Sequence, residues 1–207
     1  MTALSIIVTD SGPLITLAVA EALDALLAPR LPVIVPDMVR FEVIRDLDKP
    51  GARAVADWIR HHEPARVRVA STEVFEEFEI LRRLNPDTKT KDRGEQAAAE
   101  VLSTLLDDAD HGAILIFEDS MVRKPNFLLR LPDEVVLTST SEFLSGLERH
   151  GLIANANSIL EKAVQLRGAE ILGRQLRSTT EVPAGADWPS QLAPPLAKQP
   201  GRPSPSS

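Results

Sequence analysis

Short apolar strands alternate with helical segments along this chain of 207 residues, and this alternation constrains the fold more than any other feature of the sequence. The segment Leu4–Thr9 is β-branched, largely apolar and too short for a helix, which is typical of a buried strand in a parallel sheet. Segments of the same kind occur at Val33–Val35, Ala113–Phe117 and Val135–Leu137, with a short β-branched piece at Val67–Val69.

Helical spacing of apolar residues and alanine-rich composition mark the segments between and after these strands. Helices are predicted at Leu14–Leu27, Met38–Ile44, Gly51–Arg60, Glu73–Leu84, Gly94–Leu106, Ser141–Arg149 and Asn157–Arg177. Because alternating strands and helices build a sheet with helices on both faces, we expect a three-layer α/β/α fold with a mainly parallel central sheet.

The chain is predicted to have three parts. Residues 1–154 carry the strand and helix alternation and should form one domain, and residues 155–181 should form a C-terminal helical extension. Residues 182–207 hold seven of the chain's 16 prolines together with four serines, a composition that favours a disordered tail.

Composition excludes several classes of protein. The sequence has no cysteine, so thiolate nucleophiles and cysteine metal sites are excluded and any metal must bind oxygen or imidazole. No apolar run approaches the roughly 20 residues that cross a bilayer, and the first residues lack the basic start of a signal peptide, so we expect a cytoplasmic protein. The net charge of −7 argues against bulk electrostatic capture of nucleic acid, although a bound cation can offset local acidity.

Two acidic residues follow predicted strands and two more lie in predicted helices. Asp10 directly follows the first strand and Asp119 lies just beyond Ala113–Phe117, at the ends of strands where ligands bind in open parallel sheets. Glu42 lies in the helix after the second strand, and Glu95 in the first turn of the helix that Asp92 opens. If the four converge, their repulsion favours a divalent cation, and oxygen ligands suit Mg²⁺ or Mn²⁺. The chemistry indicated is phosphodiester hydrolysis.

Each acid also has a structural explanation, which the sequence leaves open. Asp10 and Asp119 could cap the helices that follow them, and the run from Asp92 to Glu95 could form a capping box. Glu42 could be an ordinary solvated helix residue.

Six motifs resemble those of PIN-domain proteins, in the same order and spacing. They are Ile6–Ile15, Val33–Pro36 followed by Glu42 and Val43, Gly94–Ala99, Ile114–Asp119 with Arg123, Leu137–Thr140 and Gly151–Ile153. The resemblance runs from about Ile6 to Ile153 and is closest to the bacterial VapC-type ribonuclease toxins.

This resemblance implies a ribonuclease that depends on Mg²⁺ or Mn²⁺, with Asp10, Glu42, Glu95 and Asp119 as its catalytic acids. Asp10, Glu95 and Asp119 would hold the metal. Ser11 and Thr140 would position ligands or phosphate. Where the family often has Asp-Asp-Arg this chain has Glu-Asp-Ser, which leaves the fourth ligand open between Glu118 and Asp119.

Arg93 belongs to a local excess of positive charge next to Glu95. The same excess includes Arg82, Arg83, Lys89 and Lys91, and is either a solvated face or a track for substrate phosphates.

Two functions compete at this point. The first is a metal-dependent endoribonuclease with RNA as substrate, acting as the toxin of a toxin–antitoxin pair. The second is a PIN-fold module that binds RNA or protein and cleaves weakly. A small antitoxin, implied by the resemblance, and a second copy of the chain are the candidate protein partners.

Overall fold

The centre of the molecule is a five-stranded sheet in which all strands are parallel, as expected. The computed structural model describes residues 3–107, 111–118, 131–167 and 185–192. The sheet has the order β3-β2-β1-β4-β5. Its strands are β1 (Ala3–Thr9), β2 (Val33–Pro36), β3 (Val67–Ala70), β4 (His111–Phe117) and β5 (Val135–Ser139).

Strand β1 lies at the middle of the sheet, between β2 and β4. Ile7 is in register with Val33 on one side and with Ile114 on the other. From β1 the chain builds outward to β2 and β3, then crosses to β4 and β5 on the opposite side. Beyond the carboxyl ends of β1 and β4 lies the point where the direction of winding reverses, which is the usual ligand position in such sheets.

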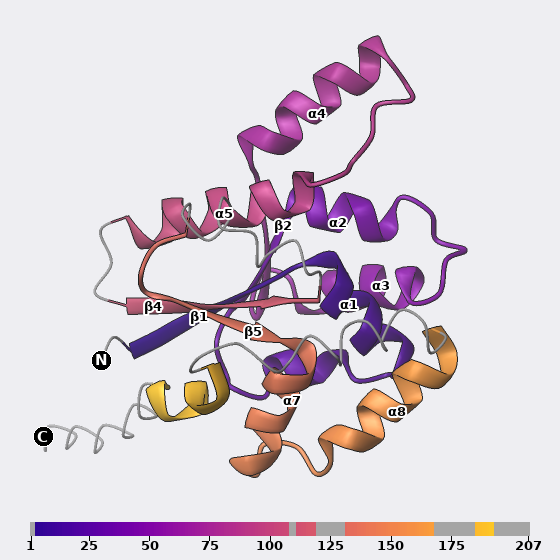
Figure 1. The fold of residues 1–207 in the computed structure, drawn as a ribbon. Helices are drawn as coiled ribbons and strands as arrows, with labels where there is room; N and C mark the ends of the chain where they lie inside the picture. The colour runs from indigo at the N-terminus through magenta and orange to yellow at the C-terminus, as the bar shows by residue number, and fades with distance from the viewer. Residues whose placement is uncertain (1–2, 108–110, 119–130, 168–184, 193–207) are drawn as a thin grey trace, which may run out of the picture.

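Helices cover both faces of the sheet, which gives the three layers (Figure 1). The described helices are α1 (Ser11–Val19), η1 (Leu23–Leu27), α2 (Asp37–Ile44), α3 (Ala52–His62), α4 (Glu73–Leu84), α5 (Arg93–Leu106), α7 (Thr140–Arg149), α8 (Ala156–Arg167) and η4 (Gly185–Gln191). None of them is both long and apolar enough to cross a membrane.

The alternation of side chains along β1 separates the two cores. Val8 packs with Val101 and Leu102 of α5 on one face. Ile7 packs on the other face with Leu14 of α1 and Val55 of α3. Because both faces are buried, the strands read as continuous apolar runs in the sequence.

The helix predicted at Leu14–Leu27 differs from the structure, because it is divided in two. Helix α1 ends at Val19, and Glu21 takes a left-handed backbone conformation with φ of 55°. The Glu21 amide donates to the Ala18 carbonyl and the Ala22 amide to the Leu17 carbonyl. These bonds close the helix as left-handed residues commonly do, and the 3-10 helix η1 follows.

The C-terminal extension shares the core of the domain. Leu160 of α8 belongs to the same buried cluster as Ile7, and Ala163 packs against Val19 and Ala20. Helix α8 therefore continues the packing of the domain and does not form a separate unit. The predicted helix beyond Arg167 lies outside the described residues.

The structure corrects the prediction of a disordered tail for residues 185–192, where η4 packs against α7. Trp188 is completely buried, and its ring stacks on Phe143 with centroids 5.0 Å apart and planes 10° apart. Proline-rich composition favours disorder, but one indole buries enough apolar area to hold a short segment. The rest of the predicted tail lies outside the described residues.

Replacing Trp188 with leucine should lower the free energy of unfolding by about 1–2 kcal/mol, because the stacking contact and part of the buried area are lost. Urea denaturation measures the change. Leu166→Ala is the control, since that side chain is 58% exposed and its loss should cost little. Equal stability of Trp188→Leu and wild type would mean that this segment contributes nothing to the fold.

Candidate active site

Asp10 lies at the carboxyl end of β1, at the junction with α1. Its amide donates to the Ile116 carbonyl of β4 at 3.1 Å, and its backbone is extended. The residue is 9% exposed, and its carboxylate makes no capping hydrogen bond to α1. The capping explanation of Asp10 is therefore wrong.

Glu42 projects from α2 into an acidic environment. Burial, together with the charges of Asp10 and Glu95, raises the pKa of its carboxyl group from 4.5 to about 7. A hydrogen bond from the Thr90 side chain and the charge of Arg45 act in the opposite direction. The interpretation of Glu42 as an ordinary solvated residue is therefore wrong.

Gly94 is the backbone position that two of the acids approach. A Cβ atom at this glycine would lie 2.8 Å from Glu42 Oε2 and 3.4 Å from Asp10 Oδ1. Real Cβ atoms essentially never come as close as the first of these distances. The absence of a side chain at Gly94 lets the first turn of α5 come close to both carboxylates.

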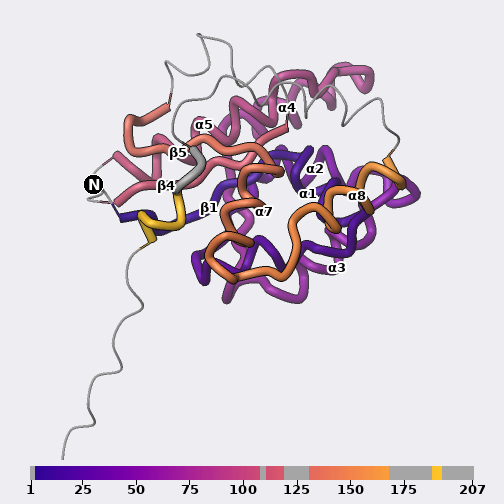
Figure 2. The backbone as a smooth tube through the Cα atoms, turned by 60° about the horizontal axis from the view of Figure 1, so that its bottom comes forward, coloured from indigo at the N-terminus to yellow at the C-terminus, as the bar shows by residue number. Residues whose placement is uncertain are grey.

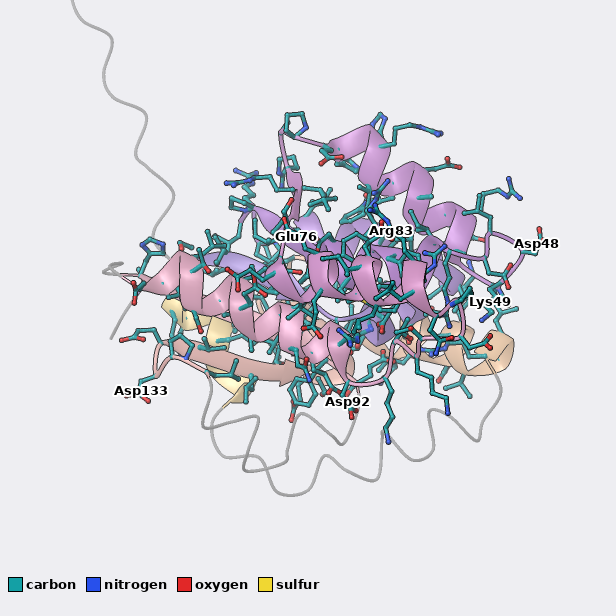
Figure 3. The ribbon with its side chains drawn as sticks, turned by 90° about the horizontal axis from the view of Figure 1, so that it is seen from above. Asp48, Lys49, Glu76, Arg83, Asp92 and Asp133 are labelled. Atoms are coloured by element: carbon teal, nitrogen blue, oxygen red, sulfur yellow. The ribbon has the colours of Figure 1, made fainter. Side chains whose placement is uncertain are left out.

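Glu95 follows in the first turn of α5, where the predicted capping box is not formed. Asp92 is the N-cap residue, but it has a left-handed backbone with φ of 61° and its side chain makes no capping hydrogen bond. Figure 3 labels Asp92 beside the start of this helix.

One cavity brings these residues together. It has a volume of about 250 Å³ and is lined by Asp10, Ser11, Glu42, Lys91, Asp92, Gly94 and Glu95. Three of the four predicted catalytic acids thus share one cavity. The fourth, Asp119, lies outside the described residues.

The predicted substrate-binding residues have different positions. Ser11 lines the cavity, and its hydroxyl lies 3.5 Å from Asp10 Oδ1. Thr140 instead donates to Glu118 Oε1 at 2.7 Å. Arg93 does not line the cavity, because its guanidinium lies 3.7 Å from Glu77 Oε1 and over the Phe78 ring. Arg93 therefore contacts α4 and not the predicted catalytic acids.

Glu118, the other candidate for the fourth ligand, is buried in an ion pair. Its side chain is 5% exposed, and Arg167 Nη1 lies 3.0 Å from its Oε2 atom. Its charge is therefore balanced by a guanidinium.

Sequence reasoning missed several residues of this region. Thr90 and Arg45 act on Glu42, and Arg167 pairs with Glu118. Arg45 is three residues from Glu42, a helical spacing that could have been noticed. Arg167 is 49 residues from Glu118 in the chain, and no local pattern connects them.

Comparisons with known proteins add no identity. No protein-family model and no curated protein matches this chain. The chemistry of the site must therefore be argued from its residues. Within residues 3–107, 111–118, 131–167 and 185–192, no three histidine or acidic side chains are arranged as a formed metal site.

Proposed function

We propose that this protein is a Mg²⁺- or Mn²⁺-dependent endoribonuclease of the PIN-domain type. The observation that carries the proposal is the cavity beyond β1, where Asp10, Glu42 and Glu95 come together. Two of these carboxylates contribute to the raised pKa of the third. Such repulsion is a cost to the fold that a bound cation relieves.

The residues fit the proposed cation in their chemistry. Asp10, Glu95 and Asp119 offer the hard oxygen donors that Mg²⁺ and Mn²⁺ prefer, and the chain has no cysteine that would favour softer metals. When bound, a divalent cation stabilises negative charge on a phosphate and makes water a better nucleophile.

Glu42 and Ser11 have separate roles in the proposal. A carboxyl group with a pKa of about 7 can accept or release a proton near neutral pH, which is what a general base requires. The Ser11 hydroxyl lies beside Asp10 Oδ1 and helps to orient that carboxylate.

A basic hollow next to the acidic cavity supports a phosphodiester substrate. It has a volume of about 390 Å³, and its lining includes Arg45, Lys89 and Lys91. Lys91 lines the acidic cavity as well, so the two spaces adjoin. None of the three cations forms an ion pair within the described part of the chain.

These cations can therefore hold phosphates that flank the scissile bond. The choice of RNA over DNA comes from the family resemblance. The same resemblance is the support for a toxin that a small antitoxin inhibits. The proposed location is the cytoplasm, and a second copy of the chain is a further candidate partner.

Neutralising the hollow should weaken RNA binding measured in EDTA, where cleavage does not interfere. Each of Arg45→Gln, Lys89→Gln and Lys91→Gln should reduce the slope of log affinity against log salt by about 0.7, the value for one phosphate contact on a single strand. Arg53→Gln on α3 is the control, because its guanidinium lies near Asp48 and away from the hollow. If the salt slopes of the three hollow variants equal that of the Arg53→Gln control, the hollow does not bind RNA.

Purified protein and single-stranded RNA test the function itself. Cleavage should require Mn²⁺ or Mg²⁺ and stop with EDTA. RNA binding by wild type without cleavage would favour the binding module, and cleavage that persists in EDTA would indicate a contaminant or another site.

A further inference from the structure

A buried ion pair joins the end of β4 to helix α8. The Arg167 and Glu118 side chains are 14% and 5% exposed, and their closest atoms are 3.0 Å apart. Thr140, the first residue of α7, donates to the other Glu118 oxygen. Both oxygens of the buried carboxylate thus have a partner, which is the condition under which a buried charge is tolerated.

The same guanidinium contacts the first turns of α1. Arg167 Nη1 lies 3.5 Å from the Gly12 carbonyl and donates to the Thr16 hydroxyl. Helices α1 and α8 lie side by side in Figures 1 and 2. A Cβ atom at Gly12 would lie only 2.9 Å from Glu118 Cβ, so α1 begins directly against this residue.

The position of Asp10 depends on where α1 begins. Asp10 immediately precedes the first residue of the helix, and its amide donates to the Ile116 carbonyl at the end of β4. The close approach of Gly12 to Glu118 and the contact of Arg167 with the Gly12 carbonyl therefore help to hold the first turn of α1, directly after Asp10, against the end of β4.

We propose that Arg167 is a positioning residue of the candidate active site, which it serves by fixing Asp10 through Glu118 and the first turns of α1. The proposal depends on the proposed function. It makes α8 a functional part of the enzyme, and it gives Glu118 a structural partner in place of a metal.

Calorimetric titration with Mn²⁺ in the absence of RNA tests the proposal. Arg167→Gln should weaken Mn²⁺ binding by about 10-fold, because the ligand Asp10 would no longer be held in place and contacts that orient a ligand typically contribute at least this much to metal affinity. Its kcat should fall while KM changes little, since the residue does not touch substrate. Arg167→Lys keeps the charge and should recover part of both losses.

Lys162→Gln is the matched control. Lys162 lies on the same helix and pairs with Glu21 at 2.8 Å, but this pair is exposed and lies at the other end of α1. Mn²⁺ affinity and kcat should equal those of wild type. Thermal unfolding shows whether each variant is folded at the assay temperature.

The outcomes separate the two proposals. If wild type neither binds Mn²⁺ nor cleaves RNA, the proposed function fails. If wild type does both and Arg167→Gln matches Lys162→Gln, the positioning role alone is overturned. Tighter Mn²⁺ binding by Arg167→Gln would also overturn it, because Arg167 would then be competing with the cation for Glu118.

A second variant covers the case in which Arg167→Gln does not fold. Thr16→Val is nearly isosteric and removes the hydroxyl that accepts from Arg167. We expect Mn²⁺ affinity to fall several-fold in this variant, and wild-type affinity would overturn the proposal.

Discussion

Asp10→Asn should lower metal-dependent RNA cleavage by roughly 10³-fold or more while the fold persists. The substitution removes a charge and nearly preserves the shape of the side chain. Because the Asp10 carboxylate makes no capping bond to α1, its loss should cost the helix little. The initial rate of cleavage of single-stranded RNA in Mn²⁺ measures the effect, with EDTA as the blank.

The other acids should behave as members of one unit. Glu42→Gln, Glu95→Gln and Asp119→Asn should each reduce cleavage strongly. The double variant Asp10→Asn/Glu95→Gln should be little worse than either single variant, because residues that serve one cation lose their effect together. Losses that multiply would instead indicate independent roles.

Asp37→Asn provides a matched control on the same helix as Glu42. Asp37 accepts hydrogen bonds from the Thr72 amide and hydroxyl at 3.0 and 2.7 Å. Its role is structural, so the variant should lose about 1 kcal/mol of stability with no selective effect on cleavage. Full activity of Asp10→Asn, or an equal loss in Asp37→Asn, would contradict the assignment of Asp10.

Without metal, the protein should become less stable as the pH rises from about 4.5 to about 7. The pKa of Glu42 is about 7 in the folded protein, against 4.5 for an ordinary glutamate. Over this range the unfolded chain releases the Glu42 proton while the folded protein retains it. The stabilisation that comes from the protonated Glu42 side chain is therefore fully present below pH 4.5 and is lost as the pH rises through 7. The loss lowers the free energy of unfolding by on the order of 3 kcal/mol.

Mn²⁺ should reverse this loss, because the cation and the proton compete for the same acidic cavity. The increase in Tm produced by Mn²⁺ should thus be larger at pH 8 than at pH 5. Without metal, Glu42→Gln should remove the part of the pH dependence of stability that comes from Glu42. At pH 8 the metal-free variant should therefore be more stable than metal-free wild type.

Urea denaturation at pH 5 and pH 8, with and without Mn²⁺, measures these effects. Glu76→Gln on α4 is the control, because Glu76, labelled in Figure 3, is exposed and is not among the residues that line the cavity. Parallel pH profiles for wild type and Glu42→Gln would show that Glu42 does not titrate as described.

Local pattern in the sequence was sufficient to predict the sheet and the place of one site residue. The apolar run Leu4–Thr9 predicts β1, and Asp10 directly after it must lie at the carboxyl edge of the sheet. Helix α4 begins at Glu73 and ends at Leu84, as predicted. Such features depend on neighbours two to four residues apart, which the sequence displays directly.

Tertiary packing alone decided how the site is assembled. Glu42 acquires its raised pKa only because burial and the approach of Asp10 and Glu95 remove it from water. The sequence also left Asp10 with two roles, a helix cap or a site residue, and side-chain geometry excluded the first.

The long-range contacts show the same division. Arg167 meets Glu118, and Trp188 meets Phe143, across long stretches of intervening chain. Periodicity and composition describe each segment alone, and composition even predicted disorder around Trp188. Which distant side chains meet is decided by the burial of apolar surface and by the requirement that buried charges be paired, and both conditions are met only in the packed chain.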